Sequence, residues 1–128
     1  MIPLCQSERV GLIPWSPLAR GVLAGNRQAG TTRARTDEFA RAMYTKTQEA
    51  DERVVDRVAK LAERHGVPPA RIALAWLLNK PAVTAPIIGA SKPHHLEDAV
   101  AALDIKLSAE DIAALEEPYV PHPVLGHS

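Results

Sequence analysis

The chain has 128 residues, with 15 basic and 15 acidic side chains, and its composition is 46% hydrophobic and 23% charged. These values are typical of one soluble globular domain, and the zero net charge argues against a nucleic-acid binder or a polybasic membrane binder. No apolar run approaches the roughly 18 residues of a membrane span, and no signal peptide is recognisable. The single cysteine, Cys5, cannot form an internal disulfide, so we expect a reducing, cytoplasmic setting.

The first part of the chain predicts a helix end, a strand and a long loop. Residues 1–9 fit the last turns of a helix, and the apolar residues 11–15 predict a strand, after which Pro17 turns the chain. Residues 26–48 are polar and carry five basic side chains against two acidic ones. They predict a long, basic variable loop, within which a short helix is expected.

Two helices are expected after this loop. Residues 50–65 carry an apolar stripe at helical spacing, and Gly66 suits the position just past a helix end. Pro69 suits the first turn of a second helix, which runs to about Asn79. This second helix is apolar on every side, so we expect it to be buried.

The remaining residues predict a second strand and two more helices. Residues 83–88 are apolar and predict the strand, and Ser91 and Pro93 suit the cap and first turn of a third helix. Three residues form the apolar stripe of that helix: Leu96, Val100 and Leu103. Residues 108–111 approximate a capping box for a fourth helix, and the tail 119–128 is expected to be extended.

The order of strand, loop, two helices, strand and two helices predicts an α/β fold with parallel β/α units. Parallel sheets need both faces covered. Two strands alone cannot satisfy that need, so we expect these elements to be part of a larger parallel structure.

Two stretches could bind a nucleotide. Residues 13–25 place Trp15 at a strand end, where its ring could stack on a planar heterocycle, and a glycine-rich turn follows whose N–H groups could face a pyrophosphate. The alternative is a core tryptophan beside a tight turn. Residues 86–98 place Gly89, Ser91 and Lys92 at a helix N-terminus, a combination that suits a phosphate monoester. The alternative there is an ordinary capped helix with a solvated lysine.

Together with three further motifs in the same order, these stretches resemble the C-terminal half of the aldo-keto reductase family. The five motifs are GLIPWSPL at 11–18, PARIALAWLL at 69–78, PIIGAS at 86–91, LSAED at 107–111 and PYVPH at 118–122. The resemblance covers nearly the whole chain and is closest to the bacterial branch whose strand reads PWSPL.

The resemblance implies the C-terminal part of a (β/α)8 barrel, formed by residues 1–128, that binds NADP(H) in the reduction of aldehydes and ketones. Trp15 would stack on the nicotinamide, and loop 26–48 would fold over cofactor and substrate. The pyrophosphate path would be lined by Ser16, Leu18, Arg20 and Gly21. The adenosine 2′-phosphate would be held by Gly89, Ser91 and Lys92. His95 stands where the branch often has glutamine, and Asp98 would reach the adenine.

The same resemblance implies catalysis by a tyrosine assisted by lysine, aspartate and histidine, all from the first half of the barrel. No counterpart of this set is recognisable here, because Tyr44 lies in the basic loop and Tyr119 after the last helix. We therefore expect no catalytic residue in these 128 residues and no turnover by them alone. Three hypotheses stay open: the NADP(H)-binding portion of a reductase, a non-catalytic nucleotide-binding or interaction module that assembles with another chain, and a truncated gene product.

Other partners are not predicted. The five histidines lack the spacing of a zinc site, and the basic loop lacks the interleaved aromatic residues of a nucleic-acid binder. A small carbonyl substrate is expected for the parent enzyme. Self-association is expected through the barrel surfaces that this chain leaves uncovered.

Overall fold

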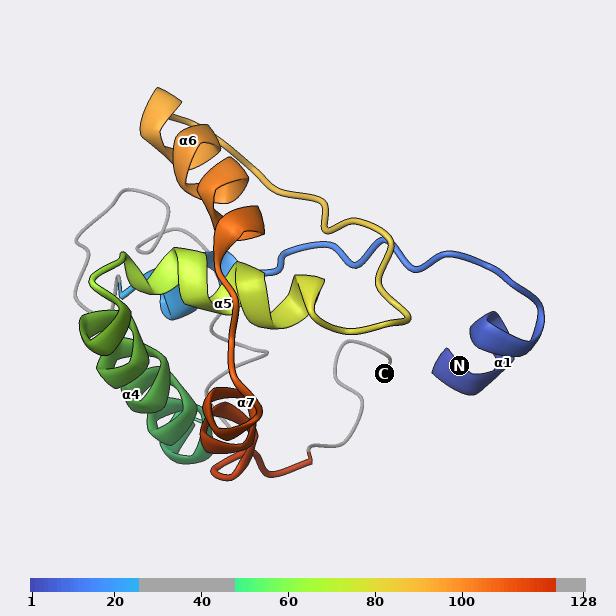
Figure 1. Cartoon of the computed structure of the whole chain (residues 1–128), viewed down its shortest axis with the longest axis horizontal. Helices are drawn as coiled ribbons and strands as arrows, with labels where there is room; N and C mark the ends of the chain where they lie inside the picture. Colours follow the sequence, from blue (N-terminus) through green and yellow to red (C-terminus); the bar gives the residue numbers. More distant parts are fainter. Residues whose placement is uncertain (26–47, 122–128) are drawn as a thin grey trace.

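The computed structural model describes residues 1–25 and 48–121. The elements in chain order are α1 (Ile2–Ser7), the 3₁₀ helix η1 (Ala19–Ala24), α4 (Gln48–His65), α5 (Pro69–Leu78), α6 (Pro93–Ala101), the 3₁₀ helix η2 (Ala102–Asp104) and α7 (Ala109–Glu116). α4, α5 and α7 pack together, α6 and η2 lie against α5, and α1 stands apart at the end of an extended segment (Figure 1). None of the described helices is long and apolar enough to cross a membrane.

The two predicted strands are extended segments that lie side by side in parallel. Leu12 pairs with Val83 and Trp15 pairs with Ile87, and both pairs are isolated bridges. No continuous strand forms among the described residues, so the strand prediction is wrong in extent, although the parallel direction is as expected.

Proline limits the pairing of these segments. Pro14 and Pro86 lie inside the two segments and have no N–H group, so each removes one donor from the ladder. The carbonyl of Pro14 still accepts a hydrogen bond of 2.8 Å from the Ile87 amide. At the other end Gly11 passes so close to Thr84 that a Cβ at position 11 would collide with the threonine side chain.

The helices α4 and α5 begin and end close to their predicted limits. Gly66 has a φ of +65°, a conformation that glycine adopts without strain. Its amide donates to the Glu63 carbonyl at 3.1 Å, and the next amide, that of Val67, donates to Ala62 at 3.0 Å. The chain thereby satisfies the last carbonyls of α4 and reverses into α5, which starts at Pro69.

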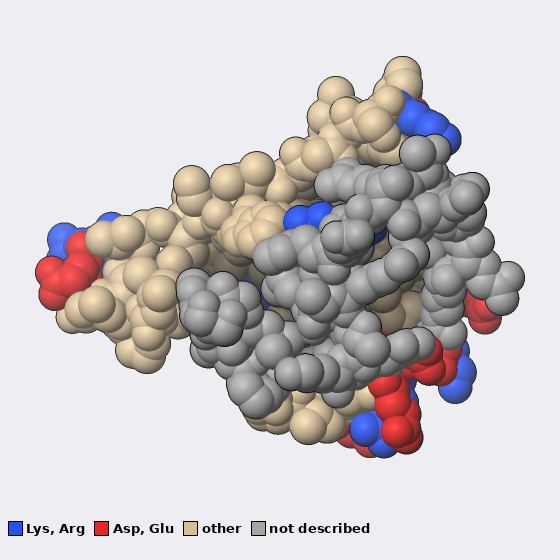
Figure 2. Space-filling model, turned by 180° about the vertical axis from the view of Figure 1, so that it is seen from behind, with Lys and Arg blue, Asp and Glu red and all other residues tan. Residues whose placement is uncertain are grey.

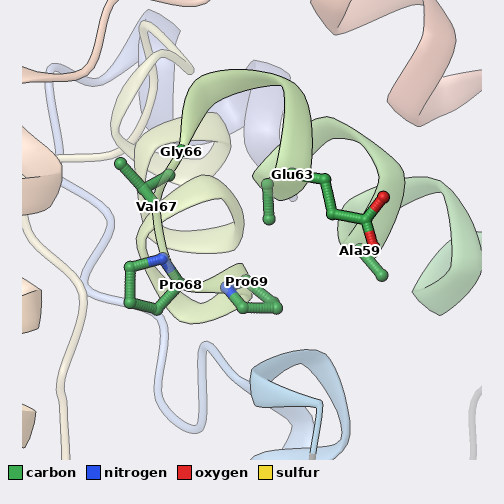
Figure 3. Close-up of a pocket in the computed structure, with 7 residues that line it drawn as sticks. Ala59, Glu63, Gly66, Val67, Pro68 and Pro69 are labelled. Carbon is green, nitrogen blue, oxygen red and sulfur yellow. The ribbon is translucent and has the colours of Figure 1, made fainter.

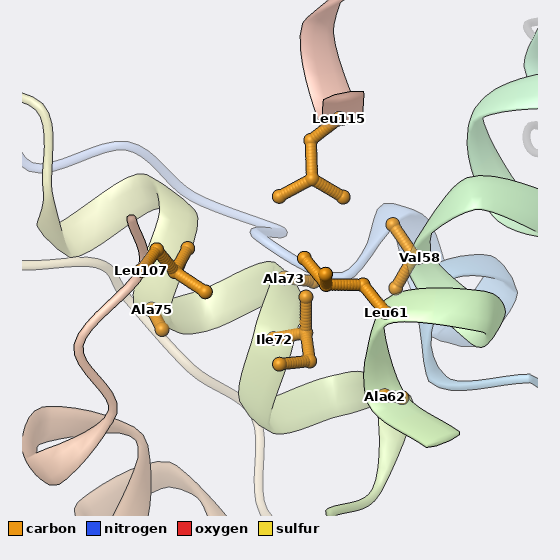
Figure 4. Close-up of a cluster of buried hydrophobic side chains, with 8 residues drawn as sticks. All are labelled: Val58, Leu61, Ala62, Ile72, Ala73, Ala75, Leu107 and Leu115. Carbon is orange, nitrogen blue, oxygen red and sulfur yellow. The ribbon is translucent and has the colours of Figure 1, made fainter. Parts of the chain in front are cut away.

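The hydrophobic core lies where α4, α5 and α7 meet (Figure 4). The buried side chains that form it are Val58, Leu61, Ala62, Ile72, Ala73, Ala75, Leu107 and Leu115. Ile72 has no exposed surface, which confirms that α5 is a buried helix. The core is aliphatic, as a composition with 4% aromatic residues requires.

Asp111 joins α7 to the end of α4. Its backbone N–H donates to Ser108 Oγ and its carboxylate accepts from the Ser108 N–H, both at 3.1 Å, which confirms the predicted capping box. The carboxylate also accepts from Arg64 and pairs with His65 Nε2 at 3.0 Å. Burial opposes ionisation of Asp111, but the Ser108 N–H, His65 and Arg64 outweigh it and hold the pKa of this carboxyl below its ordinary value.

Trp76 makes a second connection between α5 and the end of α7. Its Nε1 donates to Glu116 Oε1 at 2.9 Å, and Lys80 donates to the same oxygen while its Nζ lies 4.6 Å from the indole centroid. Hydrogen bonds from Lys80 and from Trp76 lower the pKa of Glu116. Trp76 is therefore an amphipathic contact at the edge of the core, where its N–H finds a partner.

The predicted apolar stripe of α6 does not face the core. Its three residues are more than half exposed: Leu96 55%, Val100 57% and Leu103 67%. Instead, His95 and Asp98 are among the less exposed residues of α6, and the buried Ala102 follows at the start of η2. The short side chain of Ala102 allows η2 to pack closely against α5. Asp98 is held on this side by a hydrogen bond from Arg71.

Candidate functional site

The two nucleotide-binding stretches emerge at the same edge of the paired segments. Because the bridges Leu12–Val83 and Trp15–Ile87 are parallel, the residues that follow each segment leave it in the same direction. Ser16 and the turn after it therefore start beside the residues that lead through Gly89 into α6. The carboxyl edge of parallel strands is the usual place for a ligand in α/β folds.

Trp15 is exposed over 64% of its surface. Its backbone pairs with Ile87, and Ile13 and Ile87 are also more than half exposed, at 61% and 52%. Most of the described surface visible in Figure 2 is uncharged, and acidic and basic side chains lie mainly towards its edges. The described residues thus do not bury Trp15, in contrast to the alternative of a core tryptophan.

The turn from Ser16 to Gly21 contains several left-handed residues. Ser16, Ala19 and Arg20 have φ values of 54°, 47° and 57°, although none is glycine, and Gly21 has a φ of 98°. Non-glycine residues adopt this region at a cost, and such residues concentrate at functional sites. Turns can direct successive backbone N–H groups towards an anion, although the Ala19 amide here already donates to the Ser16 carbonyl at 3.0 Å.

Hydrogen bonds inside this turn use some of the groups expected to line the pyrophosphate path. The Leu18 carbonyl accepts from the Gly21 amide at 2.9 Å and from the Leu23 amide at 3.2 Å. The Leu18 side chain packs against the hydrophobic core, so this residue anchors the turn. The Gly21 amide is therefore already bonded within the turn.

Gly89, Ser91 and Lys92 lie on an exposed segment that leads into α6. The N-cap position is Lys92 and not the expected Ser91, and no side chain caps the helix. No side chain accepts from the first-turn N–H groups, although the His95 N–H donates to the Lys92 carbonyl at 3.0 Å and Pro93 has no N–H group. Lys92 itself is exposed. An uncapped helix start beside a cation and a hydroxyl has the chemistry to bind a phosphate dianion.

His95 lies one turn into α6 and faces back to the helix start. Its Nδ1 is 3.4 Å from the Ser91 amide nitrogen and 3.5 Å from Ser91 Oγ, and its ring meets His94 edge to face with centroids 4.5 Å apart. His95 therefore contacts the residue expected to hold the 2′-phosphate, and it packs beside that site.

Asp98 is paired with Arg71, a residue that the sequence reasoning missed. Arg71 Nε donates to Asp98 Oδ1 at 2.8 Å, so one carboxylate oxygen expected to face an adenine is already engaged. A signal for this pair was present, because Arg71 is the one charged residue in the apolar helix Pro69–Leu78. A charge in such a helix needs a partner.

Other surfaces offer less chemistry. A groove of about 420 Å³ between the end of α4 and the start of α5 is lined by Glu63 and otherwise by small or apolar residues (Figure 3). A second hollow of about 440 Å³ contains the Arg57–Glu117 pair and mixed charges. No group of three metal-ligating side chains occurs in the described ranges 1–25 and 48–121. The predictions for residues 26–47 and 122–128 lie outside those ranges.

Comparison with known proteins gives related sequences along most of the chain. A Schizosaccharomyces pombe protein, whose name places it provisionally among aryl-alcohol dehydrogenases, is 47% identical over 128 residues, covering 98% of this chain and 35% of its own length. Versiconal hemiacetal acetate reductase of Aspergillus parasiticus is 40% identical over 126 residues, covering 97% of this chain and 36% of its own. The chain thus spans about a third of these relatives.

A solved structure and a family model agree with these relatives. A thermostable aldo-keto reductase in complex with the inhibitor epalrestat matches with a TM-score of 0.62 at 28% identity, covering 92% of this chain and 33% of that one. The model of the Aldo/keto reductase family matches residues 1–119. The resemblance inferred from the five motifs is confirmed, and the chain belongs to the aldo/keto reductase family.

Proposed function

We propose that this chain binds NADP(H) and forms the cofactor-holding, C-terminal part of a (β/α)8 reductase that converts aldehydes or ketones into alcohols. The observation that carries the proposal is the parallel pairing, which brings the exposed Trp15 and the entry to α6 to one edge. One relative is named as an aryl-alcohol dehydrogenase and another as a reductase, which supports chemistry between carbonyl compounds and alcohols.

The described residues fit a dinucleotide that carries a 2′-phosphate. The bound nicotinamide would supply a hydride, and the Trp15 ring would hold its plane against the carboxyl edge. The left-handed turn that contains Ser16, Arg20 and Gly21 would follow the pyrophosphate. Ser91 and Lys92 would hold the 2′-phosphate at the uncapped start of α6, where a dianion gains from the helix dipole, the hydroxyl and the ammonium.

Proton donation to the substrate oxygen is not assigned to any residue of this chain. Tyr119 follows α7, is 58% exposed, and its amide donates to the Glu116 carbonyl at 3.0 Å. It lies beyond the last helix and follows neither of the paired segments that form the carboxyl edge. General acid catalysis contributes about 10²–10⁴-fold. We therefore propose that turnover needs an acid group outside these 128 residues.

Affinity for the two nicotinamide dinucleotides tests the cofactor assignment. A charge-assisted contact contributes roughly 1.5–3 kcal/mol, so Lys92→Ala should weaken NADP binding by about tenfold or more and leave NAD nearly unchanged. Quenching of Trp15 fluorescence gives the dissociation constants. Lys106→Ala is the matched control, because Lys106 is also exposed but lies between η2 and α7. Equal weakening of NADP and NAD by Lys92→Ala would refute the 2′-phosphate assignment.

A further inference from the structure

The ion pair between Arg71 and Asp98 joins α5 to α6. The two residues are 27 positions apart in sequence, and their side chains are 31% and 20% exposed. Partial burial reduces solvent screening, and a hydrogen bond between two charged groups is about twice as strong as a neutral one. Arg71 comes from the helix that contains the fully buried Ile72, so its backbone is fixed by the core.

Apart from this ion pair, α6 itself buries little apolar surface against α5. No residue of α6 is buried, and its large apolar side chains Leu96 and Val100 point into solvent. The less exposed residues within α6 are His95, Asp98, Ala99 and Ala101. The buried Ala102 in η2 fixes the C-terminal end of α6 against α5. The N-terminal part of α6 buries little apolar surface and gains little stability from packing, so its orientation depends strongly on a directional polar contact.

We propose that Arg71 is a positioning residue that fixes α6 through Asp98 and thereby sets the direction of the helix start at Lys92. Asp98 is then the anchor of the helix and not a ligand of the adenine amino group. Asp98 lies six positions after Lys92, about 9 Å along a helix, so a tilt at the anchor displaces the start of α6 directly. The role of the helix start in holding a phosphate rests on the proposed function, whereas the anchoring itself does not.

Hydrogen exchange of the ligand-free, full 128-residue chain tests the anchor. Arg71→Met keeps the aliphatic stem of the side chain and removes its charge. Loss of a charge-assisted contact should speed exchange of the amides at 95–100 by about tenfold and leave α4 and α7 unchanged. Arg57→Met is the matched control, because it removes an exposed arginine–carboxylate pair, with Glu117 at 2.5 Å, that does not involve α6.

Two further variants separate positioning from general stability. Arg71→Lys should protect the amides at 95–100 better than Arg71→Met does. The double variant Arg71→Asp/Asp98→Arg, which exchanges the two charges, should protect these amides better than Arg71→Asp or Asp98→Arg alone. If Arg71→Met fails to fold, Asp98→Asn replaces it. This variant keeps the shape of the side chain, and it should speed the exchange of the same amides at 95–100. Unchanged exchange in α6, or an equal increase in α4, α6 and α7, overturns the anchoring role.

Two dinucleotides then distinguish an anchor from an adenine ligand. The probes are NADP and nicotinamide hypoxanthine dinucleotide phosphate, which lacks the amino group of adenine. If Asp98 is an anchor, Asp98→Asn and Arg71→Met weaken both dinucleotides by the same factor, and the double variant binds no worse than either single one. A selective loss of NADP affinity in Asp98→Asn overturns the proposal. If the unaltered chain binds neither dinucleotide, the proposed function fails, and the exchange rates of α6 still decide whether Arg71 anchors it.

Discussion

Removal of the Asp111 carboxylate should weaken the attachment of α7 to α4. Asp111→Ala deletes one half of the capping box with Ser108 and the pair with His65, while the helix-favouring alanine adds no new strain. Arg64 also contacts this carboxylate, but its side chain is 61% exposed, so solvent screens much of that interaction. The Ser108 and His65 contacts therefore dominate the expected effect.

The loss of unfolding free energy in Asp111→Ala follows from these contacts. Loss of a capping interaction costs about 1 kcal/mol, and loss of a hydrogen bond to a charged group costs about 1.5–3 kcal/mol. The free energy of unfolding should fall by roughly 2–3 kcal/mol, because the two contributions overlap in one side chain. For a domain of this size the melting temperature should drop by about 10 °C. Urea unfolding followed by circular dichroism at 222 nm measures the change.

The pH dependence provides a second measurement. The pKa of Asp111 is lower in the folded chain than in the unfolded chain. Its contribution is therefore fully present above the unfolded pKa, about 4, and is lost as the pH falls through the lower folded pKa. The difference in unfolding free energy between the unaltered chain and Asp111→Asn should shrink over that acidic range.

A neighbouring carboxylate supplies the control for this prediction. Glu110 lies in the same first turn of α7 and is exposed, so Glu110→Ala should change stability by less than about 0.5 kcal/mol. If Asp111→Ala and Glu110→Ala destabilise the chain equally, the reasoning from burial and specific contacts is wrong. A stability difference between the unaltered chain and Asp111→Asn that does not change with pH would also contradict it.

Two other predictions concern the core and the exposed face. Ile72→Ala should lower the free energy of unfolding by about 2–5 kcal/mol, since Ile72 is fully buried, whereas Val100→Ala at an exposed position should cost less than about 1 kcal/mol, and urea titrations compare the two. The exposed Ile13, Trp15 and Ile87 should cause self-association, seen as a sedimentation coefficient that rises with concentration and falls in the variant Ile13→Ser/Ile87→Ser. A chain that sediments as a monomer at all concentrations would contradict the second prediction.

The helices were predictable because their signals are local. Gly66 after the last turn of α4, Pro69 at the start of α5 and the capping box at Ser108 each act within a few residues, and the structure confirms all three. The length of the strands was overpredicted, because it was judged from apolar composition alone. Pro14 and Pro86 have no backbone N–H group to donate, so they prevent a longer ladder of hydrogen bonds between the two segments.

Errors about the site arose where the outcome depends on contacts between distant residues. Leu96 and Val100 fit a helical stripe, but spacing alone does not show which side of a helix meets its neighbour. The N-cap fell on Lys92, because the position of Pro93 at the first turn fixes the boundary and Ser91 precedes it. The engagement of Asp98 by Arg71 depends on the packing of α5 against α6, and only the lone charge in α5 indicated it.

The separation of the core from the carboxyl edge has a consequence for how this sequence can evolve. None of the buried hydrophobic residues of the core, which come from α4, α5, η2 and the region of α7, is among the residues expected to bind cofactor. Substitutions at Trp15, Ser91 or Lys92 therefore remove little buried apolar surface and cost little folding stability. Under the proposed function, cofactor preference would change through substitutions at this edge without bringing the domain to its stability threshold.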